Sequence, residues 1–199
     1  VTTDVLADEC REINRPFFKF ILTKQPWVLA KWAMTLDGKI AAHTGHSRWV
    51  TGEASRARVH QVRNEVDAIL VGVGTARMDD PELTCRIPGG RDPVRVLLDS
   101  ALSLDPSARI FDTPGTLIFC GPAASSALET RYVEKGATVI RVAHTAGGLD
   151  LHAVVRELGQ RNITSVLVEG GGAVLGSFFD ARLVDRVMAF VAPKIVGGH

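Results

Sequence analysis

The chain has 199 residues, of which 46% are hydrophobic and 23% charged, with a net charge of +1. This length predicts one or two domains with a core that needs no metal or disulfide. Basic and acidic residues are nearly balanced in number, and the chain lacks the basic stripe of nucleic-acid-binding proteins. We therefore expect no nucleic-acid partner. The longest apolar runs are too short for a membrane span, and the N-terminus lacks the layout of a signal peptide.

Cysteine and histidine usage argues against a metal site or disulfides. Cys10, Cys85 and Cys120 are widely spaced and odd in number, which fits a reducing cytoplasm, and we expect all three to be buried. His43 and His46 lie in a Gly/Ser loop without a nearby Cys or acidic partner. Zinc usually needs three or four matched ligands, so we predict no metal.

The N-terminal part begins with a helical pattern over residues 4–22 that Pro16 interrupts, which predicts one kinked helix or two short ones. A linker at 23–26 follows. Residues 27–34 have the composition of a largely buried strand, with Lys31 embedded in it.

The next segment, residues 36–50, has the turn signals of a loop. We expect Thr51 to cap a helix over 52–64. Residues 67–73 read as a short apolar strand, and residues 74–81 as a polar loop.

Strands and helices alternate through the rest of the chain. We expect strands at 94–98, 116–120, 138–142, 165–168 and 186–191. Helical patterns lie at 123–135, 151–160 and 172–181. This alternation predicts an α/β domain with a mainly parallel central sheet flanked by helices.

A glycine-rich turn is the strongest local signal. The strand at 165–168 runs into Gly170, Gly171 and Gly172, and a small-residue helix follows. Glycine permits close approach of a ligand, and a helix start attracts phosphate, so the turn is a candidate pyrophosphate cradle. The spacing is not GxGxxG, and a tight turn without a ligand is the alternative. A second cluster at 72–75 also follows a strand and is expected to line the same cleft.

Four ionisable residues are candidates for a polar site, each with a plainer alternative. Lys31 is either presented to a ligand or extends from an edge strand to water. Glu169 follows a strand and either faces a cleft or lies on the surface. Arg63 and Arg86 either clamp a phosphate together or are solvated charges.

Several motifs follow one another in a specific order. They lie at 31–41 (KWAMTLDGKIA), 45–51 (GHSRWVT), 71–86, 94–100 (VRVLLDS), 168–171 (VEGG), 183–185 and 192–197. In this order they resemble the reductase domain of riboflavin biosynthesis, over nearly the whole chain. Residues 5–22 resemble the segment that joins a pyrimidine deaminase to this reductase. The deaminase zinc signature, H-x-E with P-C-x-x-C, is absent from the sequence.

The resemblance implies a division into a remnant linker helix at 1–25 and a reductase domain at 26–199, with truncation expected at the C-terminus. It implies a dihydrofolate-reductase-like fold. It further implies NADPH-dependent reduction of 5-amino-6-(5-phosphoribosylamino)uracil to the ribitylamino product, and we expect a homodimer. A reductase of another pterin or pyrimidine, or a catalytically silent nucleotide-binding module, remains an alternative.

The resemblance also implies site residues. The expected cofactor contacts are Ala33, Trp49, Thr75, Asp79, Ser100, Gly170, Gly171, Gly172, Ala173, Val174, Leu175, Gly176 and Ser177. The expected substrate contacts are Ser47, Arg63, Leu83, Arg86 and Glu169. Lys31 and Glu169 are the candidates for orienting or protonating the reacting region. Trp32 and Thr35 stand where the family often has a small residue and Ser, which leaves the nicotinamide contacts open.

Overall fold

The computed structural model describes residues 2–41 and 51–197. Its helices are α1 (Ala7–Ile13), α2 (Arg15–Thr23), α3 (Glu53–Glu65), α4 (Val73–Asp79), α5 (Ser126–Val133), α6 (Leu151–Gln160) and α7 (Gly172–Asp180), with a 3-10 turn η1 (Arg109–Phe111). Its strands are β1 (Trp27–Thr35), β2 (Ala68–Gly72), β3 (Val94–Leu98), β4 (Leu117–Cys120), β5 (Thr138–Arg141), β6 (His144–Thr145), β7 (Gly148–Leu149), β8 (Ser165–Val168) and β9 (Arg186–Ala192).

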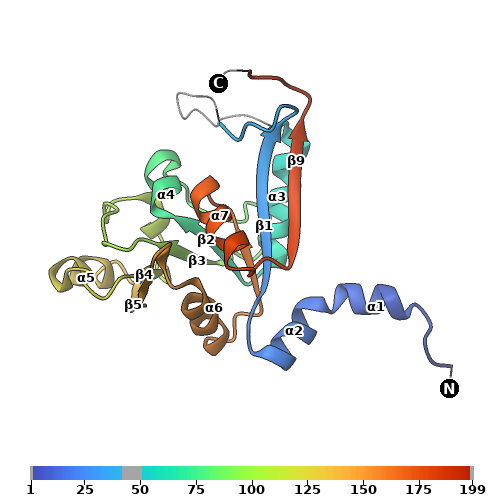
Figure 1. The fold of residues 1–199 in the computed structure, drawn as a ribbon, viewed down its shortest axis with the longest axis horizontal. Coiled ribbons are helices and arrows are strands. Elements are labelled where there is room, and N and C mark those ends of the chain that lie inside the picture. Colours follow the sequence, from blue (N-terminus) through green and yellow to red (C-terminus); the bar gives the residue numbers. More distant parts are fainter. Residues whose placement is uncertain (1, 42–50, 198–199) are drawn as a thin grey trace.

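A seven-stranded sheet forms the centre of the domain (Figure 1). Its strand order is β5-β4-β3-β2-β8-β1-β9, and every adjacent pair is parallel. The predicted α/β class with a parallel sheet is confirmed. Because parallel strands end at the same edge, β1, β2, β3 and β8 bring their following turns together at one edge of the sheet.

Alternation along each strand sends successive side chains to opposite faces of the sheet. Val166 and Val168 pack in one core cluster with α6 and α7. Leu167 packs in the other, with residues of α3, α4 and α5. Lys31 shares its face with Leu29, which belongs to the second cluster, and Glu169 continues the same alternation beyond Leu167. Both ionisable residues are therefore on the α3 side.

The N-terminal segment forms two short helices that extend away from the sheet (Figure 1). The break falls at Asn14, and Pro16 lies in the first turn of α2, where its missing N–H costs no hydrogen bond. The Lys19 Nζ lies 2.5 Å from the Asp185 carboxylate, which also accepts the Val28 N–H. This contact ties α2 to the strands.

Three sequence-based expectations were wrong in detail. Residues 73–79 form α4 rather than a polar loop, because Val73 and Ala76 supply an apolar face that packs on the second core. Helix α3 begins after Gly52 instead of being capped by Thr51, and no side chain caps it. Cys10 is exposed because α1 has no buried residues, whereas the other two cysteines are buried.

Glycine is required where α7 packs against the end of β2. A methyl group at Gly72 would lie 2.6 Å from Val174 Cγ2, and one at Gly170 would lie 2.8 Å from Val174 Cβ. Real carbon atoms do not approach so closely, so these two glycines let α7 sit directly on the sheet.

We expect Gly72→Ala to lower the free energy of unfolding by about 1–3 kcal/mol, because the added methyl overpacks this contact. The double variant Gly72→Ala/Val174→Ala should recover part of that loss. Gly74→Ala is the matched control, since a methyl there meets nothing within 4 Å. Urea unfolding measures the free energy of unfolding of all three variants. If Gly72→Ala lowers it as much in the Val174→Ala background as in the wild-type background, the packing argument is contradicted.

Candidate active site

The two glycine turns meet at the carboxyl edge of the sheet. Strands β2 and β8 are neighbours, and each leads directly into its turn. The Gly171 N–H donates to Thr75 Oγ1 at 2.9 Å, so the start of α4 touches the turn before α7. The expectation that both turns line one edge is confirmed.

The turn before α7 is open to a ligand. Gly171 and Gly172 are exposed, and no side chain caps the helix. The first-turn N–H groups of a helix have no intrahelical partner, and they favour an anion. A methyl group at Gly172 would lie 3.4 Å from Ile40 Cδ1, so glycine leaves space between the turn and the segment after β1.

A cavity of about 210 Å³ adjoins this turn. It is lined by Val73, Leu98, Ser100, Gly147, Leu149, Leu151, Ala173, Val174 and Ser177. Pockets for whole small molecules are usually about 300–1,000 Å³, so this cavity fits one part of a dinucleotide. Its apolar walls suit an aromatic or sugar group, and the glycine turn beside it suits the phosphates.

A buried ion pair lies on the α3 side of the same edge. Arg63 Nε and Nη2 donate to the two carboxylate oxygens of Glu169, at 3.1 and 2.9 Å. Arg63 Nη1 donates to the Thr84 carbonyl at 3.0 Å. The two side chains are only 13% and 12% exposed. All three guanidinium nitrogens are therefore engaged, and Glu169 is not a surface carboxylate.

Electrostatics keeps Glu169 ionised. Burial raises the pKa of its carboxyl, but the charge and hydrogen bonds of Arg63 outweigh burial, with further attraction from Lys31 and His60. The net effect is a pKa below the ordinary value. Glu169 is therefore a fixed anion near neutral pH.

Lys31 lies beside this pair on an interior strand. Ala30 pairs with Val168 across β1 and β8, which places Lys31 level with Glu169. On the other side, β1 pairs with β9, so β1 is not an edge strand. The Lys31 ammonium lies 5.8 Å from the centre of the Phe190 ring, a cation–π distance. The edge-strand alternative for Lys31 is wrong.

The segment after α4 has an unusual backbone. Asp80, Leu83 and Arg86 all have positive φ angles, of 40°, 59° and 57°. Non-glycine residues in this conformation cost about 1–3 kcal/mol and are frequent at functional sites. Leu83 is buried, whereas the Arg86 side chain is 56% exposed and pairs with Glu82 at 2.9 Å. The loop that Arg63 contacts at Thr84 therefore also carries Arg86, whose side chain is exposed to solvent.

The remaining predicted residues are distributed along the same edge. Ala33 is on β1 beyond Lys31, Asp79 ends α4, and Ser100 follows β3. The residues from Leu175 to Ser177 continue α7. Ser47, Trp49 and the two histidines at 43 and 46 lie outside the described residues. Sequence reasoning missed His60 and the Thr84 carbonyl, because nothing in the local pattern shows that α3 faces the loop after α4.

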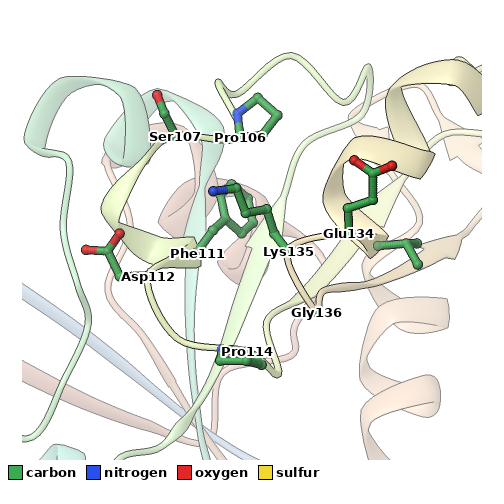
Figure 2. Close-up of a pocket in the computed structure, with 9 residues that line it drawn as sticks. Pro106, Ser107, Phe111, Asp112, Pro114, Glu134, Lys135 and Gly136 are labelled. Carbon is green, nitrogen blue, oxygen red and sulfur yellow. The ribbon is translucent and has the colours of Figure 1, made fainter.

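A second hollow lies at the opposite edge of the sheet, before β4 and β5 (Figure 2). Pro106, Ser107, Phe111 and Asp112 line it from one side, and residues 134–136 after α5 line it from the other. None of its lining side chains belongs to the charged group around Glu169. We therefore place the candidate site at the carboxyl edge.

Within the described ranges, no group of three or more His, Cys, Asp or Glu is arranged to hold a metal ion. No helix in those ranges is long and apolar enough to cross a membrane.

Known proteins resemble this chain over its whole length. The family model "RibD C-terminal domain" matches residues 26–199. The riboflavin biosynthesis protein RibD of Actinobacillus pleuropneumoniae is 38% identical, over 100% of this chain and 53% of that protein. The one from Aquifex aeolicus is 37% identical, over 99% and 54%. The chain thus spans about half the length of these relatives.

Solved structures of related proteins have the same fold over nearly the whole chain. A Thermotoga maritima diaminohydroxyphosphoribosylaminopyrimidine deaminase/5-amino-6-(5-phosphoribosylamino)uracil reductase matches with a TM-score of 0.78 and 36% identity, over 98% of this chain and 52% of that one. Acinetobacter baumannii RibD matches with a TM-score of 0.84 and 28% identity, over 96% and 52%. The dihydrofolate-reductase-like fold expected from the sequence motifs is confirmed.

We expect Glu169→Gln to lower the free energy of unfolding by about 3 kcal/mol at pH 7, because it leaves Arg63 without its buried anion. The folded-state pKa of Glu169 is lowered, so its contribution is complete above the unfolded value near 4.5 and is lost as pH falls through the folded value. The difference between wild type and variant should therefore shrink below about pH 4.5.

The control for this measurement is Glu65→Gln, which removes an exposed partner of Arg58 on the same helix. It should cost less than about 0.5 kcal/mol. A Glu169→Gln loss as small as this, or one that does not change with pH, would contradict the role of the buried pair.

Proposed function

The chain belongs to the RibD C-terminal domain family, and on this basis we propose that it reduces 5-amino-6-(5-phosphoribosylamino)uracil to the ribitylamino product with NADPH. The name of the Thermotoga relative supports the substrate. The observation that carries the proposal is the placement of a glycine turn and cavity beside a buried Arg–Glu pair at one sheet edge.

NADPH would supply the hydride, and the chain would supply position and charge. We propose that the turn at 170–172 and the first turn of α7 hold the diphosphate, with Thr75 fixing the turn through the Gly171 N–H. Ser100 and Ser177 line the adjoining cavity and would contact a sugar or ring of the cofactor. Ala33, on the neighbouring strand, and Asp79 belong to the same proposed set.

The substrate phosphate calls for a solvent-accessible cation. Arg86 meets this need, since it is exposed and its partner Glu82 also pairs with Arg109. In contrast, each guanidinium nitrogen of Arg63 already donates a hydrogen bond to Glu169 or to the Thr84 carbonyl. We therefore assign the 5-phosphate to Arg86 and give Arg63 the role of holding Glu169 and the loop before Arg86.

Reduction at the sugar C1′ requires a proton as well as a hydride, delivered to the departing ring oxygen or the imine nitrogen. Glu169 is unsuited to donate it, because its carboxyl is ionised and both oxygens accept from Arg63. Lys31 has a side chain with N–H donors and lies level with Glu169. We propose Lys31 as the donor, with Glu169 orienting it.

Two features outside the site complete the proposal. The family match begins at residue 26, which supports the assignment of 1–25 as a connecting segment. Strand β9 is an outer strand of the sheet, with Val187 and Val191 46% and 50% exposed. We propose that this surface takes part in a homodimer in the cytoplasm, an environment that fits the three free cysteines.

The proposal is tested by titrating the protein with NADPH by fluorescence and then following loss of nicotinamide absorbance with the deaminated pyrimidine substrate. We expect binding and turnover. Binding without turnover of this or any related pyrimidine or pterin would instead indicate a silent nucleotide-binding module.

We expect Arg86→Ala to raise the KM for the phosphorylated substrate about tenfold or more, because it removes the proposed phosphate ligand. The Kd for NADPH should stay within about twofold. Arg58→Ala, an exposed change on α3, is the control and should alter neither. Equal effects of Arg86→Ala on both ligands would exclude a phosphate-specific role.

We expect Lys31→Met to lower kcat about a hundredfold or more while NADPH still binds, because it removes the proposed proton donor. Glu169→Gln should also lower kcat with NADPH binding retained. Stopped-flow hydride transfer and fluorescence titration separate the two quantities. An unchanged kcat in either variant would remove that residue from the chemistry.

A further inference from the structure

The loop after β3 is folded around a buried aspartate, Asp99, which is 1% exposed. The Asp99 carboxylate accepts the Ser103 N–H at 2.6 Å, the Leu104 N–H at 2.8 Å and the Ser103 hydroxyl at 3.0 Å. Leu102 lies within this turn and has a φ angle of 54°, which residues other than glycine rarely adopt. Because a buried carboxylate is costly unless its oxygens are hydrogen-bonded, these contacts fix the conformation of the loop.

The same loop forms one wall of the cavity beside the glycine turn. Ser100 follows Asp99 directly and lines the cavity together with Leu98, the last residue of β3. The Ser100 carbonyl accepts the Gly121 N–H at 2.9 Å, which ties this wall to the segment after β4. The position of Ser100 in the cavity therefore depends on how residues 99–104 are held.

Arg77 connects this loop to α4. Its Nη2 donates to the Ser103 hydroxyl at 2.9 Å and to the Ser103 carbonyl at 3.3 Å. The Ser103 hydroxyl accepts from Arg77 and donates to Asp99, so one oxygen atom joins the helix to the buried carboxylate. Hydrogen bonds from a guanidinium are stronger than those between neutral groups. We call the side chains of Arg77, Ser103 and Asp99 the α4 clamp.

Helix α4 carries another wall of the cavity and also contacts the glycine turn. Val73 lines the cavity four residues before Arg77, and residues four apart share one side of a helix. Thr75, between them, accepts the Gly171 N–H at 2.9 Å. A shift of α4 relative to the loop after β3 would therefore move Val73 away from Ser100 and loosen the contact with the turn.

We propose that Arg77, Ser103 and Asp99 are positioning residues for the cofactor: the α4 clamp sets the spacing of the cavity walls and holds Thr75 against the glycine turn. The inference rests on the proposed function for its binding readout, in which this cavity and turn take NADPH. Its structural content is a coupling between Ser103 and Gly171, which is measurable in the free protein.

Ser103→Ala tests the clamp most selectively, because it removes the shared hydroxyl and leaves both backbone N–H groups on Asp99. We expect the Kd for NADPH to rise about fivefold, the effect of one lost hydrogen bond. The KM for the pyrimidine substrate at saturating NADPH should stay within about twofold, since the Arg63–Glu169 pair is untouched. Ser103→Thr retains the hydroxyl and should bind NADPH within about twofold of wild type. An unchanged Kd in Ser103→Ala would overturn the proposal.

Ser107→Ala is the matched control. Ser107 is exposed, as Ser103 is, and its N–H and hydroxyl both donate to Asp105 in a similar turn. This turn lines the hollow at the opposite edge of the sheet (Figure 2). We expect the two alanine variants to have similar urea midpoints of unfolding, with weaker NADPH binding in Ser103→Ala alone. A similar loss of binding in both variants would assign the effect to stability and contradict the clamp.

Arg77→Met separates positioning from direct contact with the cofactor. Because Arg77 and Ser103 act through one contact, the double variant Arg77→Met/Ser103→Ala should bind NADPH about as weakly as the more severe single variant. Effects on the Kd that multiply would show two independent contributions and contradict the clamp. Weaker binding in Arg77→Met with an unchanged Kd in Ser103→Ala would indicate a cation that contacts NADPH directly, and would likewise overturn positioning.

The backbone amide of Gly171 supplies the readout that needs no ligand. Its N–H is donated to Thr75 on α4, so a shift of the helix weakens this hydrogen bond. We expect the NMR signal of the Gly171 amide to move in Ser103→Ala and to stay in place in Ser107→Ala. If the wild-type protein does not bind NADPH, the proposed function fails while this measurement still decides the clamp. Identical Gly171 signals in wild type and Ser103→Ala would overturn the proposal in either case.

Discussion

The buried ion pair between Arg63 and Glu169 is the interaction on which the site depends. It joins residues 106 apart in the chain and fixes the end of β8 against α3. A carboxylate with so little exposure requires a partner, because an unpaired buried charge costs several kcal/mol. Since Arg63 also holds the Thr84 carbonyl, one guanidinium sets the positions of a helix, a strand end and a strained loop.

The sheet divides the site into two parts. The face covered by α6 and α7 carries the apolar cavity and the open glycine turn, which suit a cofactor. The opposite face, covered by α3, carries Lys31, Glu169 and Arg63, which suit a charged substrate and a proton transfer. The two parts meet because Glu169 and the glycines are consecutive residues, so the chain turns from one face to the other within a single loop.

Local patterns predicted much of this. Short, mainly apolar segments predicted the strands, and three consecutive glycines predicted the turn before α7. Lys31 was selected as a candidate because a charged side chain within an apolar strand needs either a partner or access to water. Residues 73–79 were missed as a helix because Gly74, Thr75 and Asp79 are weak helix formers, and packing of Val73 and Ala76 outweighs that preference. Cys10 was misjudged because an amphipathic pattern in α1 does not show whether anything covers it.

The sequence by itself determined the seven strands of the central sheet and most of the helices, that the sheet is mainly parallel, and which residues follow each strand at the carboxyl edge. Only the tertiary structure decided the order β5-β4-β3-β2-β8-β1-β9, and with it the neighbours of Lys31 and Glu169. Alternation tells which face a side chain occupies but not which strand lies beside it, because that choice depends on long-range packing. For the same reason the Arg63–Glu169 pair and the contacts of Ser103 with Arg77 and Asp99 became visible only in the folded chain.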